Sequence, residues 1–187
     1  MFGIDEQDLI DEEGNGLFTS ASLGNTSNFG LAGDANKISY VTPVMGGFKA
    51  GYSIADSGAS GTTDTNAIGA SYTMPISGGS IVVKYNQATK DGSTDTDTTN
   101  MGFQLNMGAM TLIASSGTKE IASDEDIEGN GFGIKYDMGG GMTIAASVME
   151  SEDSASDDVS TAGAKEKYSA NIAEVSYTIA PGLKANL

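Results

Sequence analysis

The sequence predicts an all-β protein whose antiparallel strands run up and down in the manner of a transmembrane β-barrel. Short Gly-rich turns recur along the chain, and the segments between them alternate apolar with polar residues. No run of about 18 to 20 apolar residues is present that would form a membrane helix, whereas barrel strands are short and alternating. A soluble β-sandwich shows the same alternation, so it stays open as an alternative.

Turns of two kinds divide the chain. Short turns rich in Gly, which readily adopts the positive φ of tight hairpins, are flanked by Tyr, Phe, Ile, Val, Met and Leu. They are Thr42–Gly47, Pro75–Gly79, Met107–Met110, Met138–Gly141 and Ala180–Gly182. Longer polar connections are expected at 56–66, 89–100, 118–130 and 150–169. Residues 37–187 therefore form five consecutive hairpins, or about ten strands.

Alternation within the strands separates two faces. In 48–55 one face carries Phe48, Ala50, Tyr52 and Ile54, and the other carries Lys49, Gly51, Ser53 and Ala55. A period of two places successive side chains on opposite faces of a sheet. The same pattern recurs in 67–74, 81–86, 101–107, 132–138, 142–148 and 174–179. The polar set is small or hydrated, which suits a water-filled lumen.

Four tyrosines stand at similar distances before short turns: Tyr40, Tyr72, Tyr136 and Tyr177. Membrane barrels carry such an aromatic girdle where the barrel meets the bilayer interface. Tyr52 and Phe103 share the apolar face with them. In a membrane barrel these rings face lipid, whereas in a soluble β protein they are buried, so their exposure distinguishes the two.

Composition excludes several functions. The chain has no Cys and no His, which removes zinc sites of these ligands, His-dependent nucleophiles and disulfides. Nine Lys against 25 acidic residues give a net charge of -16, and no Arg is present. This charge has the wrong sign for a nucleic-acid partner. We therefore expect a protein that is not an enzyme and requires no cofactor.

The charges are expected to be segregated. Only Asp137 and Glu174 of the acidic residues fall inside the proposed strands, and the others lie in loops or in residues 1–36. The lysines within strands all fall on the polar face: Lys37, Lys49, Lys84, Lys135 and Lys184. A Lys on the lipid face would cost about 2 to 4 kcal/mol at the bilayer midplane, so this placement fits a barrel.

Acidic residues gather in two of the expected loops. One group is Asp91, Asp95 and Asp97, and the other is Asp124, Asp126 and Glu128. Carboxylate oxygens are suitable ligands for Ca²⁺, so the six residues are candidate calcium ligands, and the alternative is that these acidic loops are simply solvated. A calcium-stabilised extracellular β protein, such as an adhesin or surface-layer module, is the alternative function.

Residues 1–36 differ from the hairpins. Their start is densely acidic: Asp5, Glu6, Asp8, Asp11, Glu12 and Glu13. Ile4, Leu9 and Ile10 are interleaved, and a Gly, Ser and Asn-rich stretch follows. Acidic termini are commonly disordered, whereas the interleaved apolar residues favour partial packing.

Two segments resemble the general porins of Gram-negative outer membranes, the alphaproteobacterial type above all. They are Asn36–Tyr52, which is similar to the hairpin after the porin constriction loop, and Tyr177–Ala185, which is similar to a late hairpin. The resemblance implies a homotrimer of roughly 16-stranded, water-filled barrels in outer-membrane lipid. Such barrels pass small hydrophilic solutes by diffusion.

The resemblance also assigns roles to charged residues. Residues 1–36 take the place of the acidic loop that narrows the pore, through Asp5, Glu6, Asp8, Asp11, Glu12 and Glu13. The facing basic wall would be formed by Lys37, Lys49, Lys84 and Lys135. The family usually places Arg on this wall, and its absence here favours cations. We expect the chain to represent part of a barrel, without its earliest strands and its closing strand.

Overall fold

The computed structural model of the protein describes residues 36–56, 64–91, 95–121, 125–153, 166–181 and 183–186. They form ten β-strands. The strands are β1 (Asn36–Val41), β2 (Phe48–Asp56), β3 (Thr65–Ile76), β4 (Gly79–Lys90), β5 (Thr96–Met107), β6 (Met110–Ile121), β7 (Glu125–Gly139), β8 (Met142–Asp153), β9 (Glu166–Ala180) and β10 (Leu183–Asn186). The predicted all-β class and number of strands are confirmed. None of the described residues forms a helix that could span a membrane.

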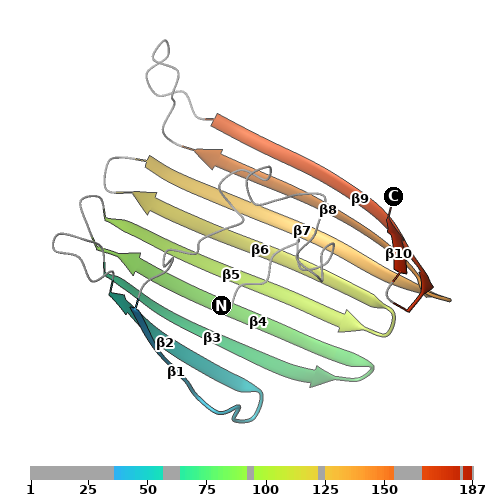
Figure 1. Ribbon diagram of the computed structural model, residues 1–187, viewed down its shortest axis with the longest axis horizontal. Helices are drawn as coiled ribbons and strands as arrows, with labels where there is room; N and C mark the ends of the chain where they lie inside the picture. Colours follow the sequence, from blue (N-terminus) through green and yellow to red (C-terminus); the bar gives the residue numbers. More distant parts are fainter. Residues whose placement is uncertain are drawn as a thin grey trace.

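All ten strands belong to one sheet, in which each pairs with the strand before and after it in sequence (Figure 1). Every pair is antiparallel. The short turns all lie at one end of the sheet, and the C-terminal ends of β2, β4, β6 and β8 lie at the opposite end. Within the described residues β1 and β10 form the two edges. This is the up-and-down topology that the hairpin rhythm predicts.

The strands extend further than the sequence alternation indicated. β6 and β7 remain paired as far as Ile121 and Glu125, and β4 and β5 as far as Lys90 and Thr96. The prediction that only Asp137 and Glu174 are acidic strand residues is therefore wrong. The reason is that backbone hydrogen bonds continue where the side chains change from apolar to charged. Much of what we expected to be acidic loop is strand beyond the apolar segment.

Cross-strand pairing defines two continuous faces, because paired residues project to the same side of a sheet. One row of neighbours across β3 to β8 is Tyr72, Val83, Phe103, Ala114, Phe132 and Val148. We call this side the apolar face. The adjacent row across β2 to β8 is Lys49, Ser71, Lys84, Gly102, Ser115, Gly131 and Met149. We call this side the polar face.

Burial is inverted relative to a soluble protein. The most buried side chains of the described residues lie on the polar face, among them Ile113 at 2% and Thr98 at 1% exposure. Large side chains of the apolar face are exposed instead, such as Phe132 and Val148, each at 48%. A soluble monomer rarely exposes a contiguous apolar patch of this extent, which marks a surface that meets lipid or another protein.

The turn between β1 and β2 offers a test of the backbone geometry. Gly46 and Gly47 both have positive φ, 58° and 87°. A Cβ on Gly47 would collide with the carbonyl oxygen of Thr73, whereas a Cβ on Gly46 would meet nothing within 4 Å. An Ala at either position would strain the backbone, because both have positive φ. Only an Ala at Gly47 would also collide with a neighbouring strand.

We therefore expect Gly47→Ala to lower the free energy of unfolding by about 1 to 3 kcal/mol more than Gly46→Ala. Denaturant titration of the refolded protein, followed by tyrosine fluorescence, measures both. Equal losses in the two variants would contradict the close approach of Gly47 to β3.

Candidate functional site

Lysines of the polar face lie in a polar neighbourhood. Lys49 on β2 and Lys84 on β4 both pair with Ser71 on the strand between them. Their backbones are therefore two strand spacings apart, about 10 Å. Lys135 on β7 pairs with Thr111 and Ala145. All three lysine residues are partly buried.

The position of Lys37 in β1 is paired with Ala55, but its side chain lies outside the described residues. The predicted acidic partners Asp5, Glu6, Asp8, Asp11, Glu12 and Glu13 also lie outside them. That the acidic segment lies opposite the basic wall therefore stays a prediction. The division of the chain into a segment of residues 1–36 and hairpins of residues 37–187 also stays a prediction.

Further charges lie on the polar face. Lys90 and Lys119, which we expected in loops, pair there with Thr65 and Thr98 respectively. Glu174 on β9 occupies the same row as Lys135, with Ala145 of β8 between them. The wall therefore carries charges of both signs, with lysines in the majority.

An amide and hydroxyl network joins three strands on the polar face. Gln104 Nε2 donates to Asn106 Oδ1 at 2.8 Å, and Asn106 Nδ2 donates to Ser80 Oγ at 3.1 Å. Thr111 Oγ1 also donates to Asn106 Oδ1, at 3.3 Å. Asn106 is thus held between β4 and β6, and this part of the wall is a fixed array of uncharged hydrogen-bonding groups.

Asn86 presents an acceptor on the same face. Its Oδ1 is buried and has no hydrogen-bond partner among the described residues. Asn86 of β4 pairs with Gly69 of β3, and Gly69 pairs with Gly51 of β2. The two neighbouring positions in this row therefore carry no side chain. A buried acceptor of this kind ordinarily has a partner, and an ordered water molecule is the usual one.

The tyrosines predicted to form a girdle lie on the apolar face. Tyr40, Tyr72, Tyr136 and Tyr177 are 66%, 44%, 45% and 49% exposed. Tyr52 and Phe103 are also exposed, at 46% and 39%. The aromatic residues are therefore outside rather than buried, which is the outcome expected of a membrane barrel and not of a soluble β protein.

A second boundary of the apolar face was missed by the sequence analysis. Toward the end with the longer connections, Tyr52 Oη donates to Asn66 Oδ1 at 3.1 Å and Tyr85 Oη donates to Gln87 Oε1 at 3.2 Å. These contacts mark where apolar side chains give way to amides. In β2 the apolar segment from Phe48 to Ile54 is about 20 Å long at about 3.3 Å per residue. The continued alternation through Asn66 and Gln87 was the signal that could have located this boundary.

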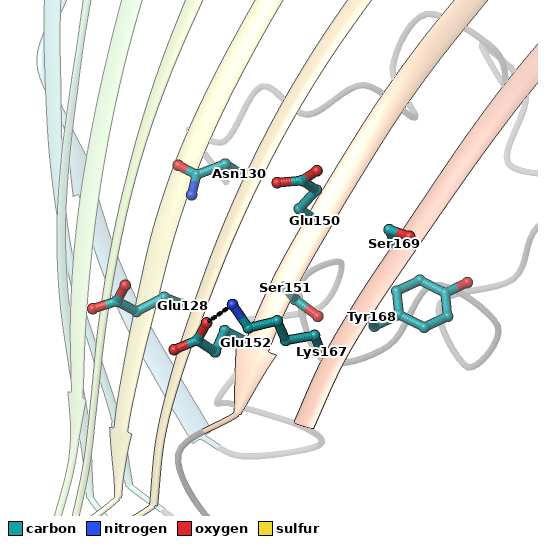
Figure 2. A pocket seen from close by; sticks show the side chains of 8 residues that line it. All are labelled: Glu128, Asn130, Glu150, Ser151, Glu152, Lys167, Tyr168 and Ser169. Atoms are coloured by element: carbon teal, nitrogen blue, oxygen red, sulfur yellow. Dashed lines mark ion pairs between the residues drawn. The ribbon is translucent and has the colours of Figure 1, made fainter. Parts of the chain in front are cut away.

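Beyond that boundary the apolar face has a polar margin, and there the structure contains a hollow of about 440 Å³ between β7, β8 and β9. Figure 2 shows the side chains that line it: Glu128, Asn130, Glu150, Ser151, Glu152, Lys167, Tyr168 and Ser169. Lys167 Nζ lies 2.9 Å from Glu152 Oε2. The sequence predicts a role, as a calcium ligand, for Glu128 alone among these eight residues.

The calcium candidates do not form a cluster in the described part of the chain. Asp91 and Asp95 flank the connection between β4 and β5, Asp97 lies in β5, and Asp126 and Glu128 lie in β7. Asp124 is outside the described residues. Among those described, no group of three or more acidic side chains is close enough to hold a metal ion. Calcium binding stays a prediction.

An up-and-down sheet with an exposed apolar face and a polar opposite face defines the wall of a membrane barrel. Residues 3–187 match the family model described as Gram-negative porin, and the chain belongs to that family. Its location is accordingly the outer membrane. None of the curated proteins matches the chain.

Solved porin structures from Pseudomonas aeruginosa share the fold. OprD matches with a TM-score of 0.63 at 12% identity, over 78% of this chain and 50% of that one. OccK5 (OpdH) matches with a TM-score of 0.61 at 13% identity, over 76% of this chain and 47% of that one. OpdL matches with a TM-score of 0.61 at 13% identity, over 75% and 47%. The chain thus spans about half the length of these structures.

Two adjacent alanines of β8 test the assignment of the faces. Ala146 pairs with Ile134 and Ala173 on the apolar face, and Ala145 pairs with Lys135 and Glu174 on the polar face. We expect Ala146→Lys to lower the free energy of unfolding in lipid vesicles by about 2 to 4 kcal/mol, because the ammonium group enters hydrocarbon. Ala145→Lys is the control and should cost under about 1 kcal/mol, since its side chain reaches water. Equal costs in a denaturant titration would refute the assignment.

Proposed function

We propose that the protein forms a water-filled channel through which small hydrophilic solutes diffuse across the outer membrane, with a preference for cations. The observation that carries the proposal is the division of one sheet into an exposed apolar face and a polar face bearing Lys49, Lys84, Asn106 and Asn86. A barrel closed with the polar face inward encloses water, because these groups are hydrated more favourably than they are packed.

The cation preference rests on the overall charge. Nine lysines and 25 acidic residues give -16, and no Arg is available to oppose it. Strands carry part of this charge beyond the apolar segment, at Asp97, Glu120 and Asp126, which are cross-strand neighbours. A field of this sign concentrates cations near the mouth of the channel.

The resemblance to general porins supports two further proposals. Residues 1–36 would narrow the pore as an acidic segment opposite Lys37, Lys49, Lys84 and Lys135. The barrels would assemble as a homotrimer. Cross-linking of the intact protein followed by denaturing electrophoresis tests the second, since a monomeric barrel gives no band at three times the mass.

Planar-bilayer conductance tests the channel itself. The intact protein should give discrete conductance steps in which potassium permeates better than chloride. Absence of steps would overturn the proposal, and a preference for chloride would overturn the selectivity.

Two variants of β4 identify the face that lines the water. Lys84→Gln and Gln87→Glu each make the protein more negative by one charge, on the polar and the apolar face respectively. In water, the Coulomb interaction energy between a unit charge and an ion about 10 Å away is about 0.4 kcal/mol before screening by salt. We expect Lys84→Gln to raise the potassium-to-chloride permeability ratio about twofold and Gln87→Glu to leave it unchanged. If Gln87→Glu raised the ratio and Lys84→Gln left it unchanged, the water would lie on the apolar side of the sheet, which would contradict the proposal.

The calcium-stabilised extracellular β protein is the alternative function, and the exposed aromatic residues count against it. Calcium at the acidic connections is compatible with either function and is tested separately. If Ca²⁺ binds, saturating Ca²⁺ raises the free energy of unfolding by about 2.7 kcal/mol at one hundred times the dissociation constant. Identical denaturant titrations in Ca²⁺ and in chelator would rule the site out, and Mg²⁺ at the same ionic strength is the control.

A further inference from the structure

We propose that lipid hydrocarbon contacts the sheet along an oblique band, which shifts toward the short turns by about one residue per strand from β2 to β9. The ends of β7 and β9 then stand clear of the bilayer, whereas β2 ends close to its surface. The proposal rests on the apolar face meeting lipid and not on the ion selectivity of the channel.

One row of cross-strand neighbours on the apolar face changes character across the sheet. On β2 to β5 it is apolar and consists of Ala50, Ala70, Tyr85 and Met101. On β6 to β9 the same row is polar and consists of Ser116, Asn130, Glu150 and Ser169. Because such rows run perpendicular to the strands, the border of the apolar residues crosses the rows and does not follow them.

The neighbouring rows give the slope of this border. The next row away from the short turns is apolar as far as Ile68 on β3 and continues with Gln87 on β4. The row on the other side stays apolar as far as Val148 on β8 and becomes polar at Asn171 on β9. The last apolar residue of β9 is then Ala173, three rows from the row of Ile68. Successive rows on one face are two residues apart, so the border moves by about six residues over the six strands from β3 to β9.

The short turns are displaced in the same direction. Phe48 begins β2, and its row reaches Asn171 on β9, which continues to Ala180 before its own turn. The apolar segments 48–54 of β2 and 173–179 of β9 have the same length and yet share no row. Figure 1 shows the turns from β1–β2 to β7–β8 displaced along the strands. Since turn positions belong to the backbone, they support the slope independently of side-chain polarity.

Tyrosines lie along two lines of the same slope. Tyr136 on β7 and Tyr177 on β9 are four and six residues nearer the turns than the row of Tyr72 on β3. These strands are four and six places from β3, so the shift is one residue per strand. Tyr85 on β4 is two residues nearer the turns than the row of Tyr52 on β2, which is again one per strand. Aromatic residues gather at the bilayer interfaces, so the two lines mark the two sides of the hydrocarbon.

Tyr40 departs from this arrangement. It pairs with Tyr52 and lies between the two lines. Of the four tyrosines predicted to form one girdle, the oblique band therefore places only Tyr72, Tyr136 and Tyr177 at a common depth.

The slope measures the tilt of the strands, because the surface of a bilayer is flat. A stagger of about 3.3 Å per strand across a strand spacing of about 4.8 Å corresponds to a tilt of about 35°. Membrane barrels close with their strands tilted by about 35 to 45°. The apolar pattern of this open sheet therefore has the stagger that a closed barrel requires.

The tilt raises one side of the wall above the bilayer. Beyond the border, β7 continues through residues 125–130 and β9 through residues 166–171, six residues in each case. Six residues of a strand tilted by about 35° rise by about 16 Å. By contrast, β2 ends two residues after Ile54. The outward-facing Glu128, Glu150 and Glu152 then lie above the hydrocarbon, where their charges remain hydrated.

Spin-label depth measurements on single-cysteine variants test the proposal, because the chain has no cysteine of its own. Ala70→Cys, Ala114→Cys and Ala146→Cys replace residues of three different rows that lie at one depth in the oblique band. Ser169→Cys replaces a residue in the same row as Ala70. None of these four side chains is buried, so each position can carry a nitroxide.

The intact labelled protein is placed in phosphatidylcholine vesicles, and collisions of the nitroxide with oxygen and with a water-soluble nickel chelate give its depth. We expect the three alanine positions to agree in depth within about 3 Å. The label at Ser169 should lie in water, about 16 Å along the membrane normal from the label at Ala70. If Ala70 and Ser169 agreed in depth while Ala146 differed from Ala70 by about 13 Å, depth would follow the rows and the proposal would be overturned.

Ala145→Cys, on the polar face beside Ala146, is the matched control. Its label should collide freely with the nickel chelate, because it faces the water of the proposed channel at a similar depth. If the labels at Ala145 and Ala146 were both shielded or both open to the chelate, the division of the faces would fail, and the proposed channel with it. If only Ala146 is shielded while depth follows the rows, the oblique band is wrong and the channel stands.

Discussion

The hydrogen-bonded ladder of the sheet is the constraint on which the rest of the structure depends. In hydrocarbon no water is available to backbone N–H and C=O groups, so each must find a partner within the protein. Ten antiparallel strands in sequential order provide those partners, because each strand pairs with its neighbours in the sequence. The ladder also fixes register, and register decides which side chains share a face. The lysine wall, the amide network around Asn106 and the hollow beside Lys167 all follow from pairings that the ladder sets.

Because the ladder does not depend on side-chain polarity, it continues beyond the apolar segment. The contacts of Tyr52 with Asn66 and of Tyr85 with Gln87 mark the transition on one face. Toward the same end of the sheet, β7 carries Glu128 and β8 carries Glu150 and Glu152 beyond the apolar segment. The acidic character of the protein is therefore displayed partly on rigid strands, which hold carboxylates at defined spacings.

Sequence reasoning located the fold well and the site only in part. Alternation around Tyr72 and Phe103 predicted the apolar face, and the Gly-rich turns predicted the hairpins, because both signals are local and repeat. The ends of the strands were misjudged, since at Thr118 to Glu128 the side chains become polar while pairing persists. Lys167 was not predicted to approach Glu152, because that contact depends on how β8 and β9 are aligned across a connection. The girdle assignment of Tyr40 and its counterparts stays a prediction about function, although their exposure agrees with it.

The sequence by itself determined the period of two, the positions of the tight turns and the excess of acidic residues. These are properties of neighbouring residues, and a strand backbone converts them directly into two faces. Only the tertiary structure decided which face is exposed and which residues meet across strands. Alternation is identical in a soluble sheet and in a membrane barrel, so the distinction required the exposure of Tyr136 and the burial of Ile113 on opposite sides. Cross-strand neighbours such as Glu128 and Glu152 are 24 residues apart in sequence (152 minus 128), and only register brings them together.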